Sequence, residues 1–392
     1  MFAPSTQRHV GNELFNERED PMKASVACLF ALSVGCGAAT ATGSAFAQTP
    51  SESQIPTSGE KVEGAPNTVK RDWGEFKLAD RIADKIKKGE PINYVFSYQA
   101  SGIPLFSPQY KAGSEMGCKV GNSIYPLNCA AIAPVQNDPN LQVSQIEAKL
   151  ASGEIDCVGI EPVSSDAMTA ITNKLMDQGI PVFTAGVSSR GHEFTNFTQI
   201  PDKEGKYAAE TVLKWIKDNN KTDIKVFAVS GGDPTQFWAQ GRMKGFEDAI
   251  KAAIPDAKFV TAAANGLNTS YEPGKAYDVY RAFLAANPDV QFIQNVDIGA
   301  EHADRAIKSL GLTGKVFTIG WNSSKGQLNA IEEGTQVAEL DQRWPDQAAF
   351  GAVACAQFLK NGVILPNTQT LKAVLKPDVN EARAELDRTM KQ

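Results

Sequence analysis

The feature that most constrains the fold is a regular alternation of short apolar strands and longer helices. A first series contains predicted strands at 92–97, 130–135, 155–160 and 181–185, separated by predicted helices at 106–117, 138–152 and 165–178. The strands are continuously apolar, which is typical of a sheet that is buried on both faces. Repeated strand–helix–strand units predict an α/β domain with helices on both sides of a parallel sheet.

A second alternating series follows the first. Its predicted strands are 195–200, 224–230, 258–263, 290–294, 315–320 and 337–341, and its predicted helices are 202–218, 236–253, 273–287, 299–310, 325–333 and 345–361. A chain of 392 residues is long enough for two domains with full cores. We therefore predict two doubly wound α/β domains that face each other, with the aperiodic stretch 186–194 crossing between them.

The N-terminus has the features of an export signal. Met22-Lys23 precedes an apolar run at 24–34, and a stretch of small residues ends in an A-x-A site at 45–47. This pattern predicts a signal peptide over 22–47, and its apolar run is too short to span a bilayer. Residues 1–21 are charged, so we take Met22 as the start. A lipoprotein would need an aliphatic residue where Ser33 stands, and we rank that alternative lower.

Residues 48–90 are predicted to form a flexible segment and a short helix. The stretch from Gln48 to about Trp73 is rich in Pro, Ser, Gly and charge, which is typical of a flexible leader. From Phe76 to Lys88 the apolar residues recur at helical spacing, which predicts an amphipathic helix before the first strand.

Four cysteines remain after removal of the signal peptide. Cys118 and Cys129 flank the turn-rich stretch 119–128, and we predict that they pair, because an oxidising compartment permits disulfides. Cys157 lies in an apolar strand and Cys355 in an apolar helix, so both are expected to be buried small hydrophobic residues. The count also allows a bridge between these two, an alternative that we rank lower.

Several classes of function lack their sequence features. The formal net charge is -6, which gives no basic excess for nucleic acid. The loop after the first strand has neither dinucleotide nor P-loop glycines. The chain has no G-x-S-x-G motif, only three His, and no metal-ligand spacing such as H-E-x-x-H. We expect no cofactor and no metal.

Amide side chains stand at the ends of three predicted strands. Asn295, Asn322 and Gln342 each close an apolar run, and a helix follows each of them. The carboxyl ends of parallel strands share one edge of a sheet, where ligands bind. Amides donate and accept hydrogen bonds, as a neutral polyhydroxylated ligand requires. The alternative is that each amide caps the next helix. Three amides at equivalent strand ends, with Trp321 next to one of them, favour a ligand site.

Aromatic residues fall at several strand-to-helix junctions. They are Phe106, Trp238, Tyr271, Trp321 and Trp344. An aromatic ring stacks well on the C–H face of a sugar, although core packing explains any single one equally well. Trp321 is the strongest stacking candidate, because the strand has just ended and its neighbour Asn322 is polar.

The chain carries the motifs I-D-C-V-G-I-E-P at 155–162, S-D-A at 165–167, G-I-P-V-F at 179–183, G-R-M-K-G-F at 241–246, N-P-D-V at 287–290, G-W-N at 320–322, and Gln342 with P-D-Q at 345–347. In these motifs it resembles type I periplasmic sugar-binding proteins of ABC transporters, in particular the ribose-binding-like members. The resemblance covers roughly residues 92–376, and its strength lies in the order and spacing of the motifs.

The resemblance implies two Rossmann-like domains joined by three crossovers, with a ligand cleft between them. The N-terminal lobe would comprise 91–199 and 343–369, and the C-terminal lobe 200–342 and 370–392. Hinges would lie near 199–201, 342–344 and 368–371.

The resemblance also implies a ligand-binding set. Phe106 and Tyr271 match stacking aromatics of the family. Asn295, Asn322 and Gln342 match polar contacts, although the family usually has Asp where Asn322 stands, and Gln240 falls where some members have Arg.

One departure from the family concerns the end of the fourth strand. Gly186 and Val187 replace an Asp-Arg pair that clamps sugar hydroxyls in ribose-like members. Arg190 is our candidate substitute from the following loop. The ligand is therefore predicted to differ from ribose.

The sequence thus predicts a periplasmic, monomeric substrate-binding protein that captures a neutral sugar or polyol and delivers it to a membrane ABC permease without catalysis. One alternative is a secreted sugar-acting enzyme, which needs a carboxylate pair. Glu161 and Asp297 stand near strand ends and are its candidates. Another is a sugar-sensing module for a chemoreceptor. A transcriptional regulator is excluded, because an export signal occupies the place of a helix-turn-helix.

Overall fold

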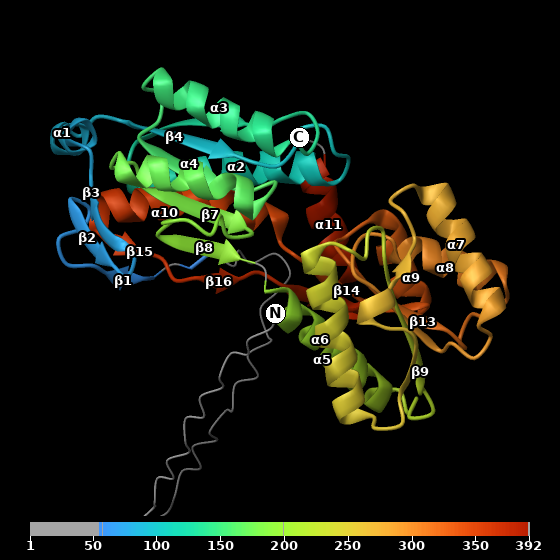
Figure 1. Cartoon of the computed structure of the whole chain (residues 1–392). Coiled ribbons are helices and arrows are strands. Elements are labelled where there is room, and N and C mark those ends of the chain that lie inside the picture. The colour runs from blue at the N-terminus through green and yellow to red at the C-terminus, as the bar shows by residue number, and fades with distance from the viewer. Residues whose placement is uncertain (1–54, 57, 199, 391–392) are drawn as a thin grey trace, which may run out of the picture. The chain divides into compact units, whose positions relative to one another are not determined.

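The computed structural model describes residues 55–56, 58–198 and 200–390, all within one compact unit. The predicted signal peptide at 22–47 lies outside the described residues. Figure 1 shows two groups of elements, each built on its own sheet, and we call them the first and second lobes.

The sheet of the first lobe has the strand order β16-β8-β7-β6-β4-β5, and every neighbouring pair is parallel. Its strands are β4 (Ile92–Ser97), β5 (Leu127–Ile132), β6 (Cys157–Ile160), β7 (Val182–Gly186), β8 (Thr195–Thr198) and β16 (Thr368–Gln369). The order reverses between β4 and β6, where the winding changes direction. Such a reversal opens a crevice at the carboxyl ends of the strands.

Helices cover both faces of this sheet, so that β6 and β7 are buried along their whole length. The helices are α2 (Phe106–Ile124), α3 (Pro139–Ala151), α4 (Ser165–Asp177) and α10 (Trp344–Asn361). Helix α10 lies against α2 and against β4, β6 and β7. Gly113 and Gly117 of α2 permit this approach, because a Cβ atom at either position would collide with the backbone of Pro345 or Ala349.

The sheet of the second lobe has the strand order β10-β9-β12-β13-β14-β17, with the short strand β11 also paired to β9. Its strands are β9 (Val226–Gly231), β10 (Lys258–Thr261), β11 (Leu267–Asn268), β12 (Phe292–Asn295), β13 (Phe317–Trp321), β14 (Gln336–Asp341) and β17 (Lys372–Val374). Only β17 runs antiparallel to its neighbour. The predicted α/β class with two doubly wound domains is confirmed.

Six α-helices and two short 3-10 helices accompany this sheet in the described part of the chain. The α-helices are α5 (Pro201–Asp218), α6 (Phe237–Ala253), α7 (Pro273–Ala286), α8 (Ala300–Ser309), α9 (Lys325–Glu333) and α11 (Val379–Met390), and the 3-10 helices are Ala263–Asn265 and Lys376–Asp378. The chain passes between the two sheets after β8, after β14 and after β16. These passages fall where the resemblance places hinges. The prediction that 186–194 crosses between the domains is wrong, because β7 and β8 on either side of this stretch pair in the first-lobe sheet.

The segment expected to be a flexible leader is folded in its second half. Strand β1 (Glu60–Lys61) pairs with β15 (Val363–Ile364), and β2 (Thr68–Arg71) forms a hairpin with β3 (Gly74–Lys77). Val69 and Phe76 are fully buried in the first-lobe core. The predicted helix begins only at α1 (Asp80–Lys88). The hairpin was missed because so few of its residues are apolar.

Both pairs of cysteines form disulfides. Cys118 lies on α2, which runs seven residues beyond its predicted end at 117, and it is joined to Cys129 of β5. The structure also joins Cys157 of β6 to Cys355 of α10. The prediction of two buried unpaired thiols is therefore wrong, and the lower-ranked bridge is the one that forms. The reason is that α10 packs directly on β6 and brings the two cysteines together.

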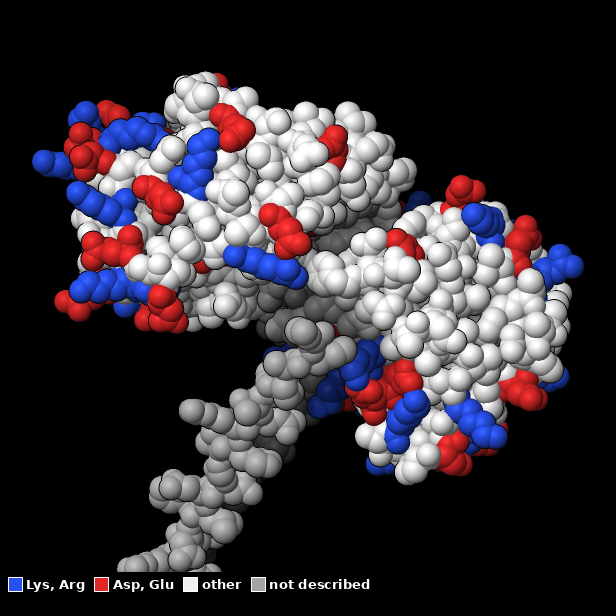
Figure 2. Space-filling model, in the orientation of Figure 1, with Lys and Arg blue, Asp and Glu red and all other residues white. Residues whose placement is uncertain are grey.

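Charged side chains of both signs are mixed over the face drawn in Figure 2, and uncharged surface separates them. No single sign of charge dominates that face, so its electrostatic interactions depend on local charged groups. Among the described residues, no helix is both long and apolar enough to cross a membrane.

Candidate functional site

Asn322 and Gln342 form a hydrogen-bonded amide pair at the ends of adjacent strands. The Gln342 Nε2 donates to the Asn322 Oδ1 over 3.0 Å, and both side chains are almost buried. Asn322 follows β13 directly, and its backbone N–H extends the sheet by donating to the carbonyl of Leu340. The bond uses one of the four hydrogen-bonding positions of the Asn322 side chain. The pair is therefore a candidate polar ligand contact.

The backbone at both amides has an unusual conformation. Asn322 has φ 62° and Arg343, directly after Gln342, has φ 59°. Left-handed backbone is uncommon outside glycine, and clusters of it often mark functional sites. Here it turns the chain sharply at the ends of β13 and β14, so that both amides lie at the strand ends.

Asn295 has a different environment from the other two amides. It is fully buried, its Oδ1 accepts from the backbone N–H groups of Asp297 and Gly299 over 3.0 Å each, and its Nδ2 donates to the Tyr280 hydroxyl over 2.9 Å. These bonds hold the turn between β12 and α8. The bonds of Asn295 therefore stay within the second lobe, and its predicted ligand contact stays a prediction.

Trp321 lies in the core of the second lobe rather than on an accessible surface. Its exposed fraction is 0%, and the guanidinium carbon of Arg242 lies 5.0 Å from its ring centroid. The same guanidinium lies 5.1 Å from the Trp238 ring, and it pairs with the buried Glu204 over 2.7 Å. This arrangement differs from the predicted stacking platform. The last residue of a strand can point inward as readily as outward, and Trp321 points inward.

The exposed aromatic groups at the strand ends of the second lobe are Tyr271 and Phe237. Their exposed fractions are 53% and 55%. Tyr271 packs beside Gly232 at the end of β9, and Phe237 opens α6. Burial, together with the negative charges of Asp297 and Asp233, raises the pKa of Tyr271, so its hydroxyl stays protonated. Tyr271 was predicted and Phe237 was missed, because sequence does not reveal which aromatic residue of a junction is exposed.

Gln240 and Arg190 both have partners within their own lobes. The Gln240 Nε2 donates to the backbone carbonyl of Pro234, three residues before α6 begins. Arg190 has φ 55° and forms a surface ion pair with Asp166 at 2.9 Å, in which both side chains are more than half exposed. Neither contact draws these residues toward the Asn322–Gln342 pair.

Phe106 begins α2 in the first lobe and is half-buried between two other aromatic residues. Its ring centroid lies 4.3 Å from that of Tyr110 and 5.2 Å from that of Trp344. Phe106 therefore joins the first strand-to-helix junction to the start of α10. These aromatic partners lie in the first lobe, and neither of them is a member of the Asn322–Gln342 pair.

The carboxyl ends of β4 and β6 carry a polar group that the sequence did not identify as a binding element. Glu161 is 3% exposed, and its Oε2 accepts from the Gln99 backbone N–H over 3.0 Å while its Oε1 accepts from the Gln99 side chain. Burial raises the pKa of Glu161 well above its usual range, against the opposing effect of the bonds from Gln99.

A chain of hydrogen bonds runs from this lobe to two crossovers. The Tyr110 hydroxyl donates to the Gln347 Oε1 over 2.8 Å. The Gln347 Nε2 donates to the Gln342 carbonyl over 2.8 Å and to the Thr370 hydroxyl over 3.0 Å. Tyr110 also interacts with Glu161, and burial is the main cause of its raised pKa. Gln347 thus connects the backbone of a candidate ligand residue with the first lobe.

Gly186 lies beside Glu161 at the end of the neighbouring strand β7. Its φ is 69°, and a Cβ atom there would lie 3.0 Å from the Glu161 Oε1. A larger side chain would be strained and would compress the carboxyl group. Glycine at position 186 therefore leaves the space that the Glu161 carboxyl group at the end of β6 occupies.

The two carboxylates considered for an enzyme are each held by their own surroundings. Asp297 is 7% exposed and accepts from the backbone N–H groups of Gly232 at 2.6 Å and Gly299 at 3.0 Å. Burial raises the pKa of Asp297, against these two bonds. Glu161 is held by Gln99 in the other lobe. Each group therefore has a structural role of its own.

Two further observations concern other kinds of site. Within residues 55–56, 58–198 and 200–390, no group of three or more His, Cys, Asp and Glu side chains has the geometry of a metal site. A surface hollow of about 580 Å³ lies between β5 and α3. Its lining residues are Tyr98, Ser101, Ala131, Ile132, Ala133, Gln145, Ala148, Lys149, Ser152 and Glu154. None of the predicted ligand residues lines it.

Two doubly wound lobes, three crossovers and polar side chains at the strand ends define the architecture of two-lobed binding proteins. The family model described as periplasmic binding protein domain matches residues 94–362. The match covers more than half of the chain, and the chain belongs to this family.

Individual relatives are more distant. A D-ribose/D-allose-binding protein of Pseudomonas aeruginosa is 27% identical over 231 residues, which are 57% of this chain and 69% of that protein. An ABC transporter solute-binding protein from Bacillus halodurans, solved with bound myo-inositol, has a TM-score of 0.62 and 17% identity, covering 75% of this chain and 98% of that one.

A periplasmic solute-binding protein of an ABC transporter from Actinobacillus succinogenes, solved with bound D-allose, gives a TM-score of 0.61 and 19% identity. The match covers 74% of this chain and 99% of that one. At these identities the two solved structures support the fold.

Proposed function

We propose that this protein captures a neutral sugar or polyol between its two lobes, without chemical change, and delivers it to a membrane ABC permease. The observation that carries the proposal is the Asn322–Gln342 amide pair at the ends of β13 and β14, beside a crossover. Neutral amides both donate and accept hydrogen bonds, which suits vicinal hydroxyl groups. Rotation about the crossovers would close the lobes on the ligand.

The relatives agree with this class of ligand. The Pseudomonas protein is named for ribose and allose, and the two solved structures hold allose and myo-inositol, all of which are neutral and polyhydroxylated. The remaining contacts that we propose are Tyr271 and Phe106 as stacking rings, with Gln240 and Arg190 as outer polar groups. Export through the segment 22–47 and a monomeric state belong to the same proposal.

A screen of pentoses, hexoses and polyols by thermal shift is the first test. A ligand that binds only the folded protein raises its midpoint, and a hundredfold excess over Kd contributes about 2.7 kcal/mol. Product analysis after incubation with each sugar tests the absence of catalysis. Conversion of a sugar by the pure protein would favour the enzyme alternative.

The amide pair is then tested with the ligand that the screen identifies. Gln342→Ala and Asn322→Ala should each weaken binding by about 1–3 kcal/mol in calorimetry, because a desolvated ligand hydroxyl loses its partner. Gln357→Ala is the matched control, since Gln357 is an amide near the C-terminal end of α10 whose Oε1 accepts from the Asn361 side chain over 2.8 Å. Unchanged affinity in both site variants would exclude the pair from the site.

A further inference from the structure

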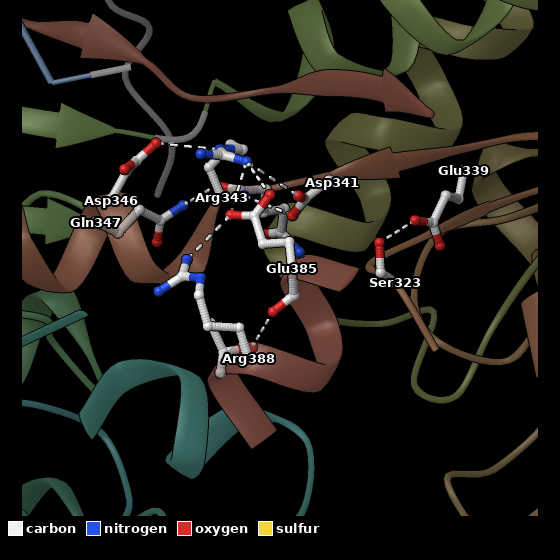
Figure 3. Close-up of polar contacts among 10 residues, drawn as sticks. Ser323, Glu339, Asp341, Arg343, Asp346, Gln347, Glu385 and Arg388 are labelled. Atoms are coloured by element: carbon white, nitrogen blue, oxygen red, sulfur yellow. Dashed lines mark hydrogen bonds and ion pairs between the residues drawn. The ribbon is translucent and has the colours of Figure 1, made fainter. Parts of the chain in front are cut away.

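Arg343 follows the candidate ligand residue Gln342 and lies in a cluster of three carboxylates (Figure 3). Its Nε lies 3.0 Å from the Asp346 Oδ2, and its Nη1 lies 2.8 and 3.0 Å from the two oxygens of Glu385. The same Nη1 lies 3.9 Å from the Asp341 Oδ2. The side chain is 3% exposed. A buried guanidinium therefore binds carboxylates from three separate points of the chain.

The cluster fixes the backbone at the end of β14. Arg343 has φ 59°, a left-handed backbone conformation that is unfavourable for a residue with a side chain. Its backbone N–H donates to the Asp341 Oδ1 over 2.8 Å, while its side chain reaches Asp346 in the first turn of α10. The first contact spans Gln342, which lies between Asp341 and Arg343, and the second ties the next residue along the chain to α10. The direction of the Gln342 side chain thus depends on how Arg343 is held.

The third carboxylate belongs to a distant part of the sequence. Glu385 lies on the C-terminal helix α11, 42 residues beyond Arg343. Helix α11 packs on α9 through a small apolar cluster that includes Leu328, Ile331 and Leu386. Glu385 also lies 3.8 Å from Arg388 one turn later. The docking of α11 on α9 therefore determines where the carboxylate that binds Arg343 stands.

The charges in the cluster explain why all three partners matter. Hydrogen bonds between an arginine and a carboxylate are among the stronger ones, because both partners are charged. Burial raises the pKa of Asp341 and of Glu385, and Arg343 opposes that rise in both. Removal of one partner from a buried pair leaves its remaining charge poorly compensated. The guanidinium would then turn toward Asp341 and Asp346, and the left-handed turn would lose its fixed geometry.

We propose that Arg343 is a positioning residue for Gln342, and that Glu385 makes this positioning depend on the docked C-terminal helix. The inference rests on the proposed function, since it assigns a second set of residues to the same site. According to this inference, the position of α11, which lies away from the strand ends, affects the ligand contact made by Gln342. A merely structural role for the pair would change stability and leave affinity unchanged.

The test compares two substitutions on one helix. Glu385→Gln keeps the size of the side chain and removes the charge that Arg343 binds. Arg383→Gln is the matched control on the same helix: its partly exposed ion pair with Glu332 of α9 contributes little, the apolar cluster keeps α11 docked, and Arg383 does not reach the crossover. We expect Glu385→Gln to weaken affinity for the screened sugar about tenfold, and Arg383→Gln to leave it within about twofold.

A second readout reports positioning directly. The side-chain amide signals of Gln342 in an ¹H–¹⁵N spectrum, assigned with Gln342→Ala, should move in Glu385→Gln and stay in place in Arg383→Gln. Arg343→Lys keeps the charge and loses the planar fork, so it should reproduce the loss of affinity. It also provides a second variant if Glu385→Gln does not fold.

The outcomes separate this inference from the proposed function. Wild-type affinity and unmoved Gln342 signals in Glu385→Gln and Arg343→Lys, with binding lost in Gln342→Ala, would overturn the positioning role and keep the site. If no sugar binds the wild-type protein, the proposed function fails. In that case the Gln342 amide signals alone test the inference. A shift of these signals in Glu385→Gln would support the positioning role, and unshifted signals would overturn it.

Discussion

The two lobes share one winding pattern but use their strand ends differently. In the second lobe, the Oδ1 of Asn295 at the end of β12 accepts two bonds from the turn that follows it. In the first lobe, Glu161 at the end of β6 is held by Gln99 from the neighbouring strand end. A polar residue at a strand end is therefore a ligand candidate only when its own turn does not use its polar atoms.

The lobes also differ in how they are cross-linked. Both disulfides lie in the first lobe, where they join α2 to β5 and β6 to α10. In the described residues of the second lobe, cohesion depends on apolar packing and on buried groups such as the Arg242–Glu204 pair. Removing covalent links should thus affect one lobe much more than the other.

The largest expected effect is the loss of the bridge between Cys157 and Cys355. Their separation of 198 residues closes a long loop, and chain-entropy estimates for loops of this order give about 4–5 kcal/mol. The double substitution of both residues by Ala should lower the free energy of unfolding by that order in denaturant titration. The matched comparison is the pair Cys118 and Cys129, whose separation of 11 residues should give about 3 kcal/mol. Peptide mapping that finds free thiols at 157 and 355 would contradict the premise.

An intermediate effect is expected at Asn295. Asn295→Ala removes the acceptor of two backbone N–H groups and the donor to Tyr280, in a residue with no exposed surface. Unsatisfied buried groups cost about 1–3 kcal/mol each, so the free energy of unfolding should fall by about 2–4 kcal/mol. Gln342→Ala, measured in the same titration without ligand, should change stability less. Equal losses in the two variants would remove the distinction between a capping amide and a ligand amide.

The smallest expected effect is at Arg190. Its ion pair with Asp166 is exposed on both sides, and such pairs contribute about 0–1 kcal/mol. Arg190→Ala should therefore leave the unfolding midpoint almost unchanged. If calorimetry shows that the same variant loses sugar affinity by more than about tenfold, Arg190 is an inner ligand contact, and our view of it as an outer group is wrong.

The sequence predicted the repeating architecture well, because helical and strand periodicity are local properties. Helix α9 was predicted with the same bounds, 325–333. The hairpin around Val69 and Phe76 was missed, since two buried side chains in a polar stretch give no period. The direction of Trp321 was also missed, because it depends on where Arg242 and Trp238 lie.

Contacts between distant residues were beyond sequence reasoning. Tyr110 and Gln347 are separated by 237 positions, and nothing in either local sequence indicates the other. The same holds for Arg343 and Glu385, which the sequence showed only as charged residues near the C-terminus. The amide pair was found because both members follow apolar strands, so that a simple rule on strand ends applied to each of them.

The position of α10 in the first lobe has a consequence for the order of folding. Phe350 and Phe358 of this helix are part of the first-lobe core, and β15 directly after it pairs with β1. During synthesis the chain completes β9 through β14 before α10 appears. The lobe that begins first therefore finishes late, because its core requires contacts between residues more than 200 positions apart. Such long-range closure is slow relative to local folding, so the second lobe should gain most of its sheet first.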